Sequence, residues 1–91
     1  MAINRLYFCW GWATRPWCGA AQGTDTHITL PVSIYYQRGF ATYTDTKATW
    51  ANTPLAVVYI SPTKIVVKGW NNTTQGYNAE ACNFSYLVVG Y

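Results

Sequence analysis

Charged side chains are scarce in this chain: Asp, Glu, Lys and Arg make up 10% of its 91 residues, against about 25% in a typical soluble domain. The six basic residues are scattered, so they form none of the patches or stripes that nucleic-acid binding normally needs. No apolar run approaches the ~20 residues of a membrane-spanning helix, and the stretch 1–5 lacks the layout of a signal peptide. The sequence therefore favours neither a nucleic-acid partner nor membrane insertion.

Residue types that bind metals are also few. The three cysteines, Cys9, Cys18 and Cys82, lack the spacing of a zinc site. Cys9 is most simply a small buried hydrophobe, whereas Cys18 and Cys82 flank long loops and could approach each other. His27 is the only histidine, and we expect it to be a polar residue at the start of a strand. No metal site and no cofactor is expected.

Acidic residues are limited to Asp25, Asp45 and Glu80. A glycosidase needs two carboxylates about 5–9.5 Å apart, one of them with a raised pKa. Two acids on neighbouring loops would meet that requirement only by accident. With a single histidine, a Ser-His-Asp arrangement also has little support. We therefore expect no enzymatic activity and no catalytic residue.

Aromatic side chains are abundant, at 18% of the sequence, with five Trp and eight Tyr. A chain of this length encloses only a modest core. So much apolar and aromatic surface is hard to bury within a monomer, and obligate assembly would cover the excess. The alternative is a monomer with an aromatic-rich core.

Period-two alternation of apolar and polar residues predicts strands throughout the chain. Leu6, Phe8, Trp10 and Trp12 share one face of the first strand, and Trp10 is expected inside the sheet. Pro31 interrupts the second strand and implies an edge or a bulge. The expected strands cover residues 6–13, 27–34, 40–46, 55–60, 64–69 and 83–91. The chain is thus expected to be one all-β domain, residues 1–91, folded as a compact antiparallel sandwich or barrel of about six strands.

Alternating strand directions sort the connections into two groups. The long loops 14–26, 47–54 and 70–82 fall at one end of the domain, whereas the connections 35–39 and 61–63 fall at the other, with both termini. Function usually sits on loops that a rigid sheet presents. The long loops are therefore the expected functional end.

The side chains on these loops suit carbohydrate recognition. Aromatic faces stack on sugar rings, while amides and Arg hydrogen-bond to hydroxyls or charged groups. The alternative is that each Trp folds back to fill its own loop. The expected ligand-binding residues are Arg15, Trp17, Trp50, Asn52, Trp70, Asn72, Gln75 and Tyr77.

Three segments together resemble a known family. They are Trp10-Gly11, the apolar-proline segment Ile28-Thr29-Leu30-Pro31, and the run from Tyr86 to Tyr91, Tyr-Leu-Val-Val-Gly-Tyr. This order is similar to that of the C-terminal receptor-binding tip domain of bacteriophage tail fibres, whose fold resembles the H-type lectins. The first loop and residues 37–54 depart from the family pattern, as expected where receptor specificity varies.

The resemblance implies a homotrimer at the distal end of a tail fibre in the virion, joined to an upstream fibre shaft. Its partner would be a host surface glycan, either lipopolysaccharide or capsule. An outer-membrane protein receptor, or a purely structural trimerisation cap, are the alternatives. Assembly in the host bacterial cytoplasm favours free thiols at Cys18 and Cys82.

Overall fold

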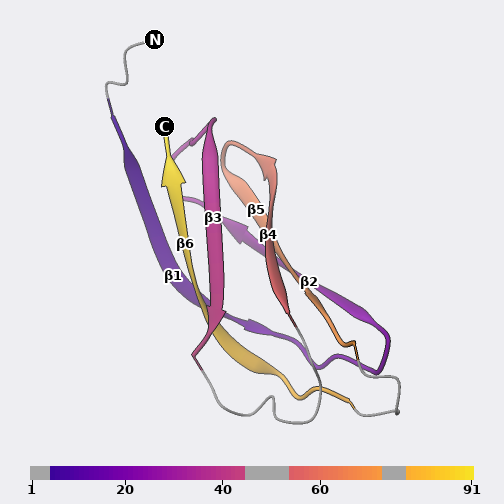
Figure 1. Ribbon diagram of the computed structural model, residues 1–91. Helices are drawn as coiled ribbons and strands as arrows, with labels where there is room; N and C mark the ends of the chain where they lie inside the picture. Colours follow the sequence, from indigo (N-terminus) through magenta and orange to yellow (C-terminus); the bar gives the residue numbers. More distant parts are fainter. Residues whose placement is uncertain (1–4, 45–53, 73–77) are drawn as a thin grey trace.

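The computed structural model describes residues 5–44, 54–72 and 78–91. This part of the chain forms two antiparallel sheets of three strands each, in the orders β1-β6-β3 and β2-β5-β4, and contains no helix (Figure 1). The two sheets make an elongated sandwich of 51 × 20 × 17 Å. The strands are β1 (Tyr7–Arg15), β2 (Gly23–Thr29), β3 (Gln37–Tyr43), β4 (Leu55–Ser61), β5 (Lys64–Trp70) and β6 (Cys82–Gly90). The prediction of an all-β antiparallel fold is confirmed.

The second strand lies earlier in the chain than its alternation predicts. It ends at Thr29, and Leu30 to Tyr36 form the connection to β3. The amide N–H groups of Leu30 and Ile34 donate to the carbonyls of Thr63 and Pro62, at 2.7 and 2.8 Å, in place of a ladder. Pro31 therefore interrupts no strand. The apolar alternation here reflects side chains that reach the core from an irregular segment.

The predicted sorting of connections is confirmed by the strand directions. Tyr7 and Gly90, near the two ends of the chain, are register partners across β1 and β6. The short turn between β4 and β5 lies at that same end. The strands β1, β3 and β5 end, and β2, β4 and β6 begin, at the opposite end, which is the lower end in Figure 1 and is called the loop end below.

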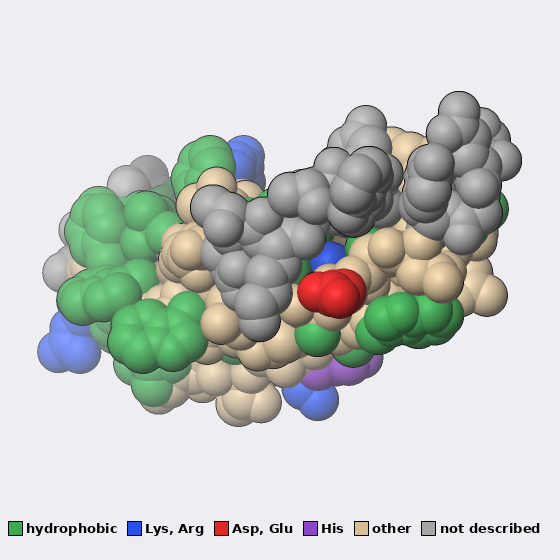
Figure 2. Space-filling model, turned by 90° about the horizontal axis from the view of Figure 1, so that it is seen from below, with side chains coloured by type: hydrophobic (Ala, Val, Ile, Leu, Met, Phe, Trp, Pro, Cys, Tyr) green, Lys and Arg blue, Asp and Glu red, His purple; other side chains and the backbone are tan. Residues whose placement is uncertain are grey.

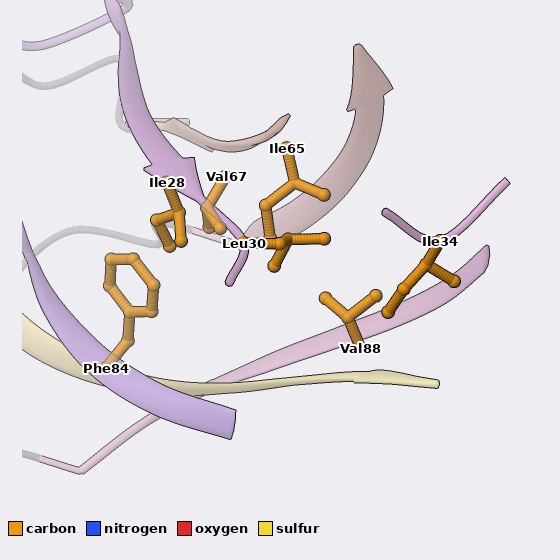
Figure 3. Close-up of a cluster of buried hydrophobic side chains, with 7 residues drawn as sticks. All are labelled: Ile28, Leu30, Ile34, Ile65, Val67, Phe84 and Val88. Carbon is orange, nitrogen blue, oxygen red and sulfur yellow. The ribbon is translucent and has the colours of Figure 1, made fainter. Parts of the chain in front are cut away.

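The core lies between the two sheets. Ile28, Ile65 and Val67 of the β2-β5-β4 sheet point toward Phe84 and Val88 of β6 (Figure 3). Leu30 and Ile34 from the β2–β3 connection complete this cluster of buried residues. The inner positions of β1 include the small residues Cys9, Gly11 and Ala13, and the Tyr86 side chain of β6 lies against Gly11. A Cβ added at Gly11 would lie 2.6 Å from the Tyr86 hydroxyl.

The large aromatic residues of β1 point outward. Trp10 and Trp12 are 75% and 80% exposed, and Phe8 is exposed on the same side. Register places Trp10, Leu87 and Phe40 in one row across β1, β6 and β3. The expectation that Trp10 lies inside the sheet is wrong, because the narrow interior admits only the opposite face of β1. The outward residues Phe8, Trp10, Trp12, Phe40, Leu87 and Val89 are called the aromatic face.

Hydrophobic side chains are visibly gathered on the β1 side when the molecule is viewed from the loop end (Figure 2). They extend across neighbouring strands as one surface, since the rows of the sheet bring them together. Within the described segments, no helix is long and apolar enough to cross a membrane.

Candidate functional site

The first and third connections at the loop end are joined by backbone hydrogen bonds. Cys18 and Ala79 exchange two of them, with N···O distances of 2.9 and 2.8 Å. The Asn71 amide donates to the Gln22 carbonyl at 2.9 Å, and the Asn71 carbonyl accepts from Ala21 at 3.0 Å. The buried Asn71 side chain also donates to the Cys18 carbonyl at 3.1 Å. The first and third connections are therefore joined into one hydrogen-bonded unit at the loop end.

Arg15 is the main correction to the expected binding residues. It is the last residue of β1, and only 1% of its surface is exposed. Its Nε donates to the Tyr43 hydroxyl at 2.9 Å, while its terminal nitrogens donate to the carbonyls of Pro16 (2.7 Å) and Glu80 (2.6 Å). The guanidinium also lies 5.7 Å from the centre of the Tyr43 ring. Arg15 holds the loop end together and presents no charge to a ligand.

Trp17 and Trp70 are both at the loop end and are 56% and 48% exposed. Each rests on a glycine. A Cβ at Gly19 would lie 3.3 Å from the Trp17 ring, and one at Gly23 would lie 2.9 Å from the Trp70 ring. Each ring thus packs on its surroundings and keeps about half of its surface open, so packing and ligand contact are compatible at both positions.

The other expected binding residues divide into two groups. Asn72, the second residue after β5, is exposed. Trp50, Asn52, Gln75 and Tyr77 lie outside the described residues. Asn71, which falls within the expected loop 70–82, is fully buried, and nothing in its local pattern distinguishes it from Asn72.

The acidic residues at the loop end have separate roles. Asp25 belongs to β2 and not to a loop, and its Oδ1 lies 3.1 Å from Nζ of Lys68 on β5. Glu80 is exposed, and its backbone carbonyl is the acceptor for Arg15. Asp45 lies outside the described residues. Sequence analysis placed Asp25 on a loop because it began the second strand too late.

His27 and the cysteines complete the titratable groups of interest. His27 is exposed within β2, opposite Val66, and not at the start of a strand. The described residues contain no group of three or more His, Cys, Asp or Glu that could hold a metal ion. All three cysteines are free thiols. Cys18 donates to the Gln22 carbonyl at 3.0 Å, and burial raises the pKa of the Cys9 thiol.

Two shallow grooves offer space for a partner or ligand. One, of about 330 Å³, crosses the aromatic face between Trp10, Trp12 and Phe40. The other, of about 320 Å³, lies at the loop end of the β2-β5-β4 sheet and is bounded by Trp70, Asp25 and Lys68. The arrangement suits binding through stacking and hydrogen bonds. No protein-family model, curated protein or solved structure matches this chain.

Proposed function

We propose that this chain is the receptor-binding tip of a bacteriophage tail fibre, with an H-type lectin-like fold, and that it recognises a glycan of the bacterial surface. The observation that carries the proposal is the separation of the two ends of the sandwich. Tyr7 and Gly90 pair at one end, while the exposed Trp17, after β1, and the exposed Trp70, the last residue of β5, lie at the other. A shaft joined at the first end would leave these side chains facing the host.

The chemistry of the loop end supports recognition over a purely structural cap. Trp17 and Trp70 keep about half of their surface exposed, next to connections that are joined by backbone hydrogen bonds. Exposed Trp in a packed protein is typical of binding surfaces, where a rigid aromatic ring gives contact area at little entropic cost. Lipopolysaccharide and capsule are the proposed ligand classes. The functional location is the distal end of the fibre in the virion.

We further propose that the tip is a homotrimer in which copies of the chain cover the aromatic face. A fully buried aromatic side chain removes about 150–250 Å² from water, and the four on this face are 55–80% exposed in the single chain, so they represent about 400–700 Å². That is at or above the size of the largest patch on a typical monomer, about 300–600 Å². Leu87 and Val89 extend it toward the ~800 Å² per partner of a stable interface. Phe8, Trp10 and Trp12 each begin a row of residues across β1, β6 and β3. Arg38 is the only charged residue in these three rows, so copies of the chain meet without strong repulsion.

Binding to whole bacteria tests the proposed function. Fluorescently labelled protein is expected to bind host cells after protease treatment of the cell surface, and to lose binding after periodate oxidation of surface sugars. Purified lipopolysaccharide or capsule from the same cells should compete. Loss of binding after protease treatment alone would identify an outer-membrane protein receptor instead. Absence of binding to every strain of a broad panel would favour the structural cap.

A further inference from the structure

We propose that the groove at the loop end of the β2-β5-β4 sheet binds one neutral hexopyranose ring, stacked on Trp70 and hydrogen-bonded by the Asp25–Lys68 ion pair. This inference rests on the proposed recognition function and names a site and ligand class within it. Sequence reasoning singled out Trp70 but placed Asp25 among loop residues and gave Lys68 no role. Register brings all three to one outward surface.

Trp70 forms an aromatic platform. It is the last residue of β5 and pairs with Gly23, the first residue of β2. The absence of a side chain at Gly23 lets the indole lie across the neighbouring strand, where a Cβ would approach ring atoms to 2.9 and 3.2 Å. One side of the ring is thus supported by backbone, and 48% of the residue stays exposed. A supported ring with an open face is what stacking on the apolar side of a sugar requires.

The ion pair supplies donors and acceptors beside this platform. Lys68 precedes Trp70 by two residues on the same face of β5, about 7 Å along the strand, and faces Asp25 across the ladder. Both side chains are half-exposed, and their contact joins Nζ to Oδ1 at 3.1 Å. An ammonium carries three donors and a carboxylate two acceptor oxygens. Two ammonium protons and Oδ2 are therefore available, within the described contacts, to neighbouring hydroxyls of a ring.

The shape of the groove limits the size of the ligand. On β4, the residue paired with Lys68 is Ala56, whose small side chain leaves the floor open. Pro54 lines the side toward the loop end. The volume of about 320 Å³ is at the small end of the 300–1,000 Å³ range of ligand pockets. The groove therefore fits a single ring or the end of a chain better than a long oligosaccharide.

Charge argues for a neutral ligand. The positive charge of Lys68 is balanced by Asp25 within the groove, so a phosphate or carboxylate group would gain little net attraction. The apolar platform and the paired donor and acceptor instead match a ring with one apolar side and hydroxyls at its edge. The groove is also on the opposite sheet from the aromatic face, so assembly through that face leaves it open.

The test combines ligand titration with cell binding, using the full chain. The probes are methyl glycosides of glucose, galactose and N-acetylgalactosamine, followed by saturation-transfer NMR and Trp fluorescence. We expect at least one to bind, and Trp70→Ala to weaken binding about tenfold or more, as for an aromatic hot spot. Asp25→Asn, which keeps the shape of the side chain, should weaken it in the same direction. Tyr59→Ala is the matched control, because Tyr59 is an exposed aromatic residue on β4 of the same sheet but does not line the groove.

The possible outcomes distinguish failure of the groove proposal from failure of the proposed tail-fibre function. Retained glycoside and cell binding in both Trp70→Ala and Asp25→Asn would overturn the groove while leaving the recognition function intact. The groove proposal would also be overturned if the wild-type protein bound cells but bound none of the glycosides. If glycosides bind in the groove but no cells are bound, the groove stands and the tail-fibre function fails. Should Trp70→Ala unfold, as circular dichroism would show, Asp25→Asn alone decides the question.

Discussion

Arg15 is a single side chain that joins three parts of the molecule. Its donors reach Tyr43 on β3 and the carbonyls of Pro16 and Glu80 on the two connections at the loop end. A buried guanidinium is tolerated because its planar donors are satisfied in several directions at once. The same buried position that removes Arg15 from ligand binding makes it a main determinant of loop-end geometry.

Substitution of Arg15 should therefore destabilise the fold. We expect Arg15→Met to lower the free energy of unfolding by about 2 kcal/mol or more, because the carbonyls of Pro16 and Glu80 lose their charged donor. Arg15→Lys should not restore stability, since an ammonium cannot reproduce the planar set of donors. Urea denaturation at fixed protein concentration measures both. Arg5→Met is the control: Arg5 is exposed, and its hydrogen bond is to the hydroxyl of Tyr7, two residues away, at 3.5 Å. Equal losses at the two positions would contradict this role.

Substitution of Thr26, in contrast, is expected to raise the stability of the fold. Its hydroxyl is buried on the inner side of β2, and no described group hydrogen-bonds to it. Thr26→Val keeps the shape, removes an unsatisfied polar group and suits a strand, so stability should rise by about 1 kcal/mol. Thr29→Val, at an exposed position of the same strand, should change little. A melting temperature that falls for Thr26→Val would show that the hydroxyl is hydrogen-bonded in solution.

At the scale of elements, β6 is the strand on which pairing in the β1-β6-β3 sheet depends. It is the central strand of its sheet and pairs with β1 on one side and β3 on the other. Its end is held firmly: the Tyr91 carbonyl accepts from the amides of Tyr35 and Tyr36 at 3.0 and 2.9 Å. The rings of Tyr36 and Tyr91 lie 5.3 Å apart. Gly90 is buried so closely against Tyr36 that a side chain has no room.

Truncation tests the importance of this end. Deleting Gly90 and Tyr91 should lower the melting temperature by several degrees, because it removes paired backbone groups and buried aromatic area. Deleting residues 1–4 should have a much smaller effect, since β1 begins only at Tyr7. Differential scanning fluorimetry of the two truncations compares them directly. Equal melting temperatures would show that the Tyr91 contacts contribute little.

The sequence predicted the strands better than the direction in which they face. Alternation identified β1, but both of its faces carry large or apolar residues, and only the position of Tyr86 shows that the Gly11 side is internal. The burial of Arg15 was likewise unpredictable, because two of its three acceptors, the Tyr43 hydroxyl and the Glu80 carbonyl, come from distant segments. The groove depends on the pairing of Gly23 with Trp70, a register that no local pattern specifies.

At the scale of the whole molecule, the two sheets expose different surfaces. The outer side of the β1-β6-β3 sheet is the aromatic face, and that of the β2-β5-β4 sheet carries His27 and the Asp25–Lys68 pair. This contrast favours an assembly in which other copies of the chain cover the aromatic face, whereas the outer side of the β2-β5-β4 sheet stays open to solvent. Assembly would also multiply weak single-site binding by presenting several copies of the loop end together.

The exposed aromatic face leads to a prediction of the oligomeric state. Light scattering should show the mass of a trimer of the 10.2 kDa chain. The double substitution Trp10→Ser with Trp12→Ser should yield a folded monomer, because both side chains are largely exposed in the single chain. Trp17→Ser should leave the trimer unchanged. A wild-type protein that is monomeric at micromolar concentration would remove the trimer proposal, and a stable trimer of the double variant would place the interface elsewhere.

The pairing of β1 with β6 also has a consequence for how the chain acquires its structure. Of the six strands, β1 is synthesised first, yet its ladder partner is β6, which is synthesised last. The whole β1-β6-β3 sheet therefore stays unpaired until β6 has been synthesised. Contacts between segments so distant in sequence slow folding. During that interval Trp10 and Trp12 lie on an unpaired apolar strand, so this segment is the expected starting point of misassembly at high expression.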